Sequence, residues 1–267
     1  KLFKHSASIG NYIRVFDVSG EFASLTNEFG GKIIRCSGRE GMLNPLEILR
    51  AGENDEVSYA NHISKLQTFF KCIIPSMDDI LRQELANQLR SLYAAYHLTP
   101  ENDNQITGRE AVDYPILTDF KNYLIQMINK IKNADELALT DVETNLNIEK
   151  ARNLSSLLGA VENLINNYGS IFNGHSAINN ITSEQIVCFD ISSIKDLGDI
   201  FAAQMQILVS LCWDNAVSNG TKMKERWYDG SYASADRTCA GVGDEDNYYQ
   251  GLDSLSFEEG DDDRGRS

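Results

Sequence analysis

Two carboxylates, Asp17 and Glu21, are the residues of this chain best placed to do chemistry. They follow residues 12–16, a short run that is apolar except for Arg14 and is typical of a strand. In open α/β sheets, ligands bind at the carboxyl ends of the strands. A structural alternative exists, because Asp is also a preferred N-cap for a following helix. The residues themselves leave both interpretations of Asp17 open.

A βαβ unit is predicted to position these carboxylates. After the strand at 12–16, a helix is expected over residues 20–28, and a second apolar strand over 32–36. Gly30-Gly31 lies between the last two segments and is a natural helix stop. The spacing therefore favours an α/β fold with the two strands in one sheet.

The same pattern of an apolar strand followed by aspartate returns late in the chain. Residues 185–189 are predicted to form a third strand, and Asp190 follows it directly. A long helix that is apolar on most faces is expected over residues 197–216. We expect Asp190 to be a structural cap on that helix, because Asp is a preferred N-cap. The third strand is expected to lie in the same sheet as the first two.

The middle of the chain shows helical periodicity instead. Apolar residues recur three and four positions apart, which predicts helices over residues 57–73, 76–96, 115–132 and 141–168. Ser76 is the expected N-cap of the second of these helices. Such apolar stripes are typical of the core of a helical subdomain and not of a cofactor site.

Composition excludes some classes of function. The 267-residue chain has a formal net charge of −15, which argues against a protein that clamps nucleic acid along its whole surface. The five cysteines form no C-x-x-C pair, and the spacing of the four histidines predicts no metal site. No apolar run is long enough to span a bilayer, and no helix has the basic and aromatic faces of a lipid-binding helix.

The two ends of the chain differ from the rest. Residues 1–8 have the pattern of the end of a helix, so the chain is expected to be part of a longer protein. Residues 229–267 contain 11 acidic residues and 3 basic ones, and apolar periodicity stops near Arg226. We expect the segment 227–267 to be a disordered or out-of-frame tail.

Several short motifs, taken in order, resemble one protein family. Residues 17–22 (DVSGEF) resemble the D-P-x-G-E-Y element of the HerA–FtsK group of P-loop motor ATPases. The motifs GGKIIR at 30–35, LNPL at 43–46, FNGHS at 172–176 and FDISSIKDL at 189–197 then resemble the ATPase domain of VirB-type (TraE/TrsE-like) conjugation ATPases. The resemblance covers residues 1 to about 226.

The resemblance implies an incomplete RecA-like P-loop NTPase sheet interrupted by an all-α insertion. The implied parts are an ATPase core at 1–50, a helical insertion at 51–180, a resumed core at 181–226 and the tail at 227–267. The family hydrolyses ATP with Mg²⁺ to power type IV secretion, and such catalysis depends on positioning and charge neutralisation around the phosphoryl group. Glu21 would orient or polarise the attacking water, and Asp17 would hold that loop or a metal-bound water.

The chain also departs from the family. It contains no Walker A pattern, no apolar strand ending in Asp-Glu after the long helix, and no later arginine finger. The chain alone is therefore expected to be inactive and to bind no cofactor tightly. By resemblance, partners would be other ATPase subunits, the conjugation channel and coupling proteins, at the inner face of the cell membrane. Two alternatives stay open: a fragment of a HerA-like DNA-translocating motor, or a non-catalytic helical interaction module.

Overall fold

A small parallel sheet lies at one end of the molecule. The computed structural model describes residues 1–51, 54–101, 104–134, 140–178, 181, 183–218 and 224–228. The strands in these residues are β1 (Tyr12–Asp17), β2 (Lys32–Arg35), β3 (Ile186–Asp190) and β4 (Lys224–Tyr228). They lie in the order β2-β3-β1-β4, and every neighbouring pair is parallel.

The three predicted strands are confirmed and lie side by side. β3 is inserted between β1 and β2, with Ile13 beside Ile186 and Ile33 beside Cys188. The βαβ spacing of β1 and β2 therefore leaves room for a strand that arrives much later in the chain. A crossover of this kind needs the helix-length connection that α2 (Phe22–Glu28) supplies.

β4 is a strand that the sequence did not predict. It follows the long helix α7 (Asp199–Ser218) and pairs with β1 on the side opposite β3. Its sequence, KERWY, mixes charged and aromatic residues, so a search for an apolar run ending in Asp-Glu misses it. The disordered tail was predicted to start at residue 227, but Trp227 and Tyr228 belong to β4 and pair with β1. The rest of that segment lies outside the described residues.

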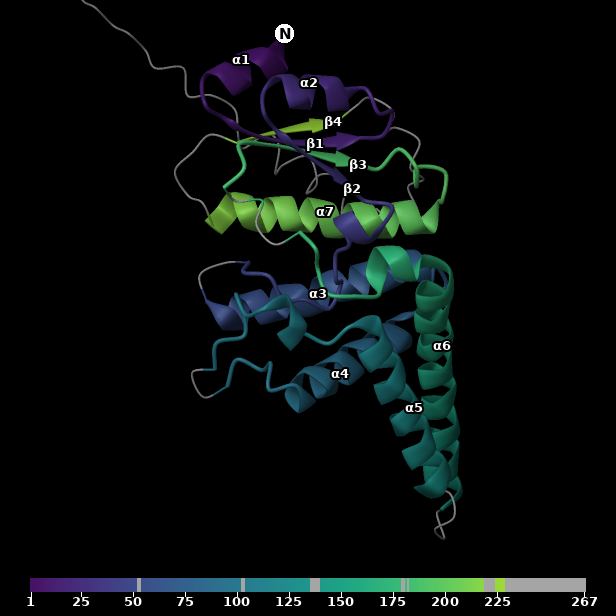
Figure 1. The fold of residues 1–267 in the computed structure, drawn as a ribbon. Helices are drawn as coiled ribbons and strands as arrows, with labels where there is room; N and C mark the ends of the chain where they lie inside the picture. The colour runs from purple at the N-terminus through teal and green to yellow at the C-terminus, as the bar shows by residue number, and fades with distance from the viewer. Residues whose placement is uncertain are drawn as a thin grey trace, which may run out of the picture.

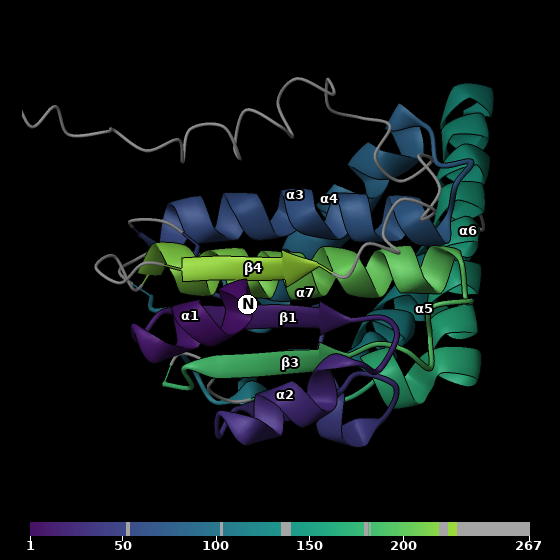
Figure 2. The same cartoon turned by 90° about the horizontal axis from the view of Figure 1, so that it is seen from above.

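Helices cover both faces of the sheet. α1 (Leu2–Ser8) and α2 lie on one face, and α7 lies on the other, as Figures 1 and 2 show. The strands alternate accordingly, because successive side chains point to opposite faces. Val15 packs with α1 and α2, whereas the next residue, Phe16, stacks on Phe189 with ring centroids 5.6 Å apart on the α7 side. Burial on both faces explains why β1 and β3 read as nearly continuous apolar runs.

Arg14 is the exception in the apolar run of β1, and the structure buries it. Its guanidinium donates to the backbone carbonyls of Ile13 (3.0 Å), Gln185 (3.2 Å) and Ile181. Burial lowers the pKa of the guanidinium. These carbonyl acceptors tie the segment that leads into β3 to the central strand.

A helical region separates β2 from β3 in the chain and packs against α7 (Figure 1). Its helices are α3 (Asp55–Ile73), α4 (Asp79–Ala95), α5 (Leu117–Ala134) and α6 (Asp141–Phe172), with short 3-10 turns η1 (Arg39–Gly41) and η2 (Ala111–Asp113). α3 lies along α7, so α7 is held between the sheet and the helical region. α5 and α6 pack along each other and extend away from the body.

Several predicted helix boundaries shift by a few residues, among them the start of α4 and the end of α6. Ser76 was expected to cap α4, but Asp78 does so and accepts from the backbone N–H of Leu81 at 2.8 Å. Asp78 is the residue directly before the helix, which is where a cap must stand. α6 was expected to end at Gly169, but it continues to Phe172 across a kink at Tyr168.

Candidate functional site

The ends of three strands form a row of charged residues at the carboxyl edge of the sheet. Parallel register places Asp17 of β1 beside Asp190 of β3, and Asp190 beside Arg35 of β2. The residues two positions earlier on these strands all pack on the side of α1 and α2. Because side chains two apart share a face, this charged row also faces α2. Exposure increases along it, from buried Asp17 to exposed Arg35 on the edge strand.

Asp17 anchors the turn between β1 and α2. Its side chain is 1% exposed, and Oδ1 accepts from the backbone N–H of Gly20 at 2.7 Å and Glu21 at 3.2 Å. Oδ2 accepts from the N–H of Phe22 at 2.9 Å. These N–H groups at the start of α2 have no partner within the helix, so the carboxylate satisfies them. Asp17 is therefore not the N-cap itself, which is Glu21. Its carboxylate has the structural role of holding the loop that carries Glu21.

Glu21 combines a fixed backbone with an available side chain. It stands at the N-cap position of α2, with its own N–H bound to Asp17. The preceding Gly20 has φ +80°, a left-handed conformation that glycine adopts at little cost. The Glu21 side chain is exposed and caps no backbone group of α2. A carboxylate held in this way at the carboxyl edge suits the positioning of a water molecule. Its catalytic role remains a prediction.

Asp190 does not cap the long helix, contrary to the prediction. α7 begins at Asp199, nine positions further on. Oδ1 of Asp190 instead accepts from the backbone N–H of Ser192 at 3.1 Å and from its hydroxyl at 2.6 Å. A short aspartate side chain readily bonds the backbone two residues on, which explains the turn that follows β3.

Two of the family-like motifs meet in the tertiary structure. The backbone N–H of Asn44, in the motif at 43–46, donates to Oγ of Ser176, in the motif at 172–176, at 2.9 Å. The Asn44 amide also donates to the carbonyl of Pro115 at 2.9 Å. Both bonds are buried, so they join the loop after β2 to the ends of α5 and α6. These motifs therefore have a structural role in fixing the helical region against the sheet.

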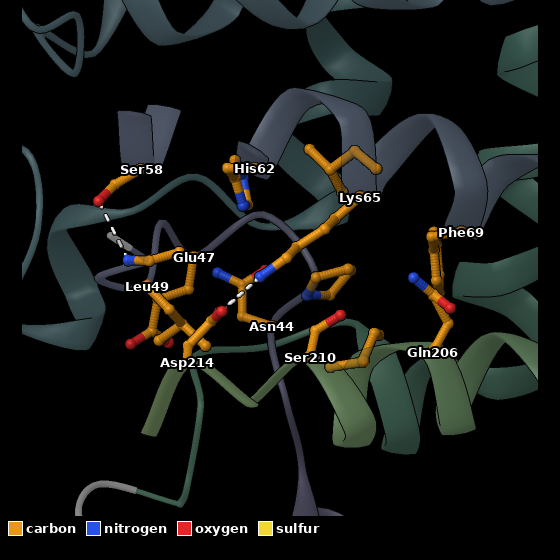
Figure 3. Close-up of a pocket in the computed structure, with 14 residues that line it drawn as sticks. Asn44, Glu47, Leu49, Ser58, His62, Lys65, Phe69, Gln206, Ser210 and Asp214 are labelled. Atoms are coloured by element: carbon orange, nitrogen blue, oxygen red, sulfur yellow. Dashed lines mark hydrogen bonds and ion pairs between the residues drawn. The ribbon is translucent and has the colours of Figure 1, made fainter. Parts of the chain in front are cut away.

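A small pocket lies between α3 and α7 (Figure 3). Lys65 of α3 and Asp214 of α7 form an ion pair across it at 2.6 Å, and Glu47 and His62 also line it. Burial raises the pKa of Glu47. The cavity volume of about 50 Å³ has room for a few water molecules and not for a nucleotide. We therefore place the candidate site at the charged row and not in this pocket.

His62, which lines the pocket between α3 and α7, is a neutral histidine. Its Nε2 lies 2.7 Å from the hydroxyl of Tyr93, which donates to the carbonyl of Leu46 at 3.1 Å. Since the hydroxyl gives its one hydrogen to Leu46, Nε2 must carry the proton and donate to Tyr93. Burial, and secondarily the charge of Lys65, lowers the pKa of His62 to about 3. In the unfolded chain the pKa of a histidine is about 6.5. Between pH 6.5 and pH 3, the unfolded state therefore binds one more proton at His62 than the folded state does.

We expect His62→Gln to flatten the acid side of the pH–stability profile. In the native protein, this histidine should lower the free energy of unfolding by about 2 kcal/mol between pH 7 and pH 5, because protonation favours the unfolded state. Urea unfolding of both proteins across this range measures the difference in slope. His5→Gln, at an exposed position on α1, serves as the control and should leave the slope unchanged. Equal slopes for native protein and His62→Gln would contradict the assignment.

Comparison with known proteins supports the family resemblance. No protein-family model matches the chain. The uncharacterized protein pXO2-09 of Bacillus anthracis is 32% identical over 231 residues, which is 80% of the chain. The match covers 34% of that relative, so the chain spans about a third of its length. The solved structure of VirB4 of Thermoanaerobacter pseudethanolicus superposes with a TM-score of 0.69 over 90% of this chain and 82% of that chain, at 19% identity.

The chain has a VirB4-like fold. The resemblance to VirB-type conjugation ATPases that the sequence motifs indicated is thereby confirmed. At this identity the likeness concerns the fold, so the roles of individual residues are argued from the geometry above. The charged row and the Asp17–Glu21 turn lie at the carboxyl edge of this VirB4-like sheet.

Arg35 is a site residue that the sequence interpretation did not single out. It lies in the GGKIIR motif, which served only as a family landmark. Its position as the last residue of a strand, like Asp17 and Asp190, was the available signal. Periodicity alone does not show that β3 lies between β1 and β2, so Arg35 could not be placed beside Asp190 before the sheet order was known.

The described residues contain neither a metal-binding cluster nor a membrane-spanning helix. No group of three or more His, Cys, Asp or Glu side chains there is arranged to hold a metal ion. No helix in the same part of the chain combines the length and apolar character required to cross a bilayer.

Proposed function

We propose that the chain is part of a VirB4-like motor ATPase that powers type IV secretion and conjugative DNA transfer by a mobile genetic element. In this proposal the sheet and its flanking helices form part of a RecA-like nucleotide-binding core, and α3–α6 form a helical insertion in it. The VirB4-like fold and the motif order support this assignment. ATP and Mg²⁺ are the proposed cofactors of the whole protein. The chain contains no Walker A pattern, so residues outside this sequence would hold the β- and γ-phosphates.

One observation carries the proposal. Glu21 presents an exposed carboxylate at the carboxyl edge of a parallel sheet, on a turn that three hydrogen bonds to Asp17 hold in place. This is the edge at which α/β sheets bind ligands. A carboxylate fixed there can orient the water that attacks a γ-phosphate, since phosphoryl transfer depends mainly on positioning and charge.

The proposed partners and location follow from the same assignment. The protein would assemble with further copies of itself and with channel and coupling components of a secretion system. Its place would be the cytoplasmic side of the cell membrane, reached through these partners. Contact with the transported DNA is not required by the proposed mechanism.

Glu21→Gln in the natural full-length protein tests the function. We expect the rate of Mg²⁺-dependent ATP hydrolysis to fall about 100-fold or more, the usual contribution of a group that positions or activates water. The affinity for a non-hydrolysable ATP analogue should stay close to that of the native protein, because the amide keeps the size of the side chain. Steady-state phosphate release and calorimetric titration provide the two measurements.

Glu28→Gln is the matched control on the same helix. Glu28 ends α2 and pairs with Lys4 at 3.0 Å on the exposed surface, away from the strand ends. Its substitution should leave hydrolysis unchanged. Undiminished hydrolysis by Glu21→Gln would overturn the role of Glu21, and a native full-length protein that neither binds nor hydrolyses ATP would overturn the proposed function.

A further inference from the structure

The charged row contains one exposed cation, and its geometry sets it apart from other surface arginines. Arg35 ends β2, and its side chain takes part in no hydrogen bond or ion pair with other residues that the structure describes. Asp190, its neighbour in register, uses Oδ1 to bind Ser192. Asp17, one strand further, accepts three backbone N–H groups. The guanidinium therefore stays available for a ligand.

Arg35 and Glu21 lie on the same side of the sheet edge. Ile33, two residues before Arg35, packs in the small core under α1 and α2. Glu21 stands at the N-cap of α2, which covers the same face of the sheet. The alternation of the strand directs Arg35 to the same side as Ile33. These two exposed residues, one positive and one negative, thus flank the end of β3.

We propose that Arg35 contacts the terminal phosphate of a nucleoside triphosphate held at this edge, opposite Glu21. The inference rests on the proposed function and names a residue that distinguishes the triphosphate from the diphosphate. A guanidinium suits this task because its planar fork of N–H donors matches phosphate oxygens and its charge persists at all relevant pH values. Glu21 would orient the water on one side of the phosphate while Arg35 neutralises charge on the other.

A structural role for Arg35 makes a different prediction. Charges on edge strands often prevent the addition of another strand, and Lys32 on β2 is also exposed. If Arg35 served only this purpose, its replacement would change solubility and leave nucleotide discrimination unchanged. The ratio of affinities for a triphosphate analogue and for ADP therefore separates the two roles.

The test uses Arg35→Gln, Arg35→Lys and the control Arg39→Gln in the natural full-length protein. Arg39 is exposed, lies four residues further in η1, and offers the same loss of charge outside the row. Calorimetry with a non-hydrolysable ATP analogue and with ADP should show that Arg35→Gln reduces the preference for the triphosphate about tenfold. Arg35→Lys should keep part of that preference, and the thermal midpoint of all three variants should match the native protein.

The possible outcomes distinguish a failure of the proposed role of Arg35 from a failure of the proposed function. Native-like discrimination by Arg35→Gln, in a protein that binds and hydrolyses ATP, would overturn the role of Arg35 and leave the proposed function in place. An equal loss in Arg39→Gln would also overturn it, because the effect would then reflect net charge. Absence of ATP binding by the native protein would overturn the proposed function together with this inference.

Discussion

Replacing Asp17 with alanine should lower the free energy of unfolding by about 2–4 kcal/mol, because it leaves three N–H groups at the start of α2 without their acceptor. The carboxylate is 1% exposed and its bonds to Gly20, Glu21 and Phe22 are 2.7, 3.2 and 2.9 Å long. Bonds to an ionised acceptor are stronger than those between neutral groups. Urea unfolding at neutral pH, followed by circular dichroism, measures the loss.

Two further variants show whether the lost stability comes from the hydrogen bonds of the Asp17 carboxylate. Asp17→Asn keeps one carbonyl oxygen as an acceptor and should lose less than alanine. Asp190→Ala removes the neighbouring aspartate of the charged row, whose described side-chain hydrogen bonds reach only Ser192, and should cost about 1 kcal/mol. An Asp17→Ala protein as stable as the native one would show that the turn before Glu21 does not depend on this carboxylate.

Gly41→Ala should destabilise the protein by about 3 kcal/mol or more, the upper range for overpacking a buried position. A Cβ at Gly41 would lie 2.1 Å from the carbonyl oxygen of Arg35, 2.7 Å from its carbonyl carbon and 2.9 Å from Cα of Cys36. All three are backbone atoms at the end of β2, so no side chain can rotate away. The strand end that carries Arg35 would have to move.

Gly38→Ala is the matched control in the same loop. A Cβ at Gly38 would meet no atom within 4 Å, and its φ of −155° is extended backbone that any residue adopts. Its effect on the free energy of unfolding should stay within about 0.5 kcal/mol. Thermal and urea unfolding of the two variants decide the matter, and similar stabilities would mean that η1 can shift without cost.

The sheet edge links these stability effects to the proposed chemistry. Asp17 fixes the turn of Glu21, and the close approach of Gly41 fixes the backbone that follows Arg35. Asp17→Ala should therefore also disturb the position of Glu21, and Gly41→Ala that of Arg35. A site that depends on positioning requires rigid supports of this kind.

Local patterns in the sequence determined most of the elements. The apolar runs of β1, β2 and β3 and the three-and-four spacing of the helices are properties of neighbouring residues, so periodicity predicts them. The motif order indicated a resemblance to VirB-type ATPases, and the VirB4-like fold agrees with it. Glu21 at the start of a helix after a strand was predicted from the same local signals.

Tertiary structure decided how these elements combine. β3 lies between β1 and β2, which creates the charged row, and β4 pairs with β1 although its sequence is not that of an apolar strand. Asp17 anchors its turn because folding brings its carboxylate within hydrogen-bonding distance of three backbone N–H groups. Asp190 instead bonds to Ser192 in the turn that follows it and does not cap α7. The physical reason is that strand order and register depend on contacts between residues far apart in the chain. Such contacts leave no periodic trace in the sequence, so the partners of a charged side chain become known only when the sheet is assembled.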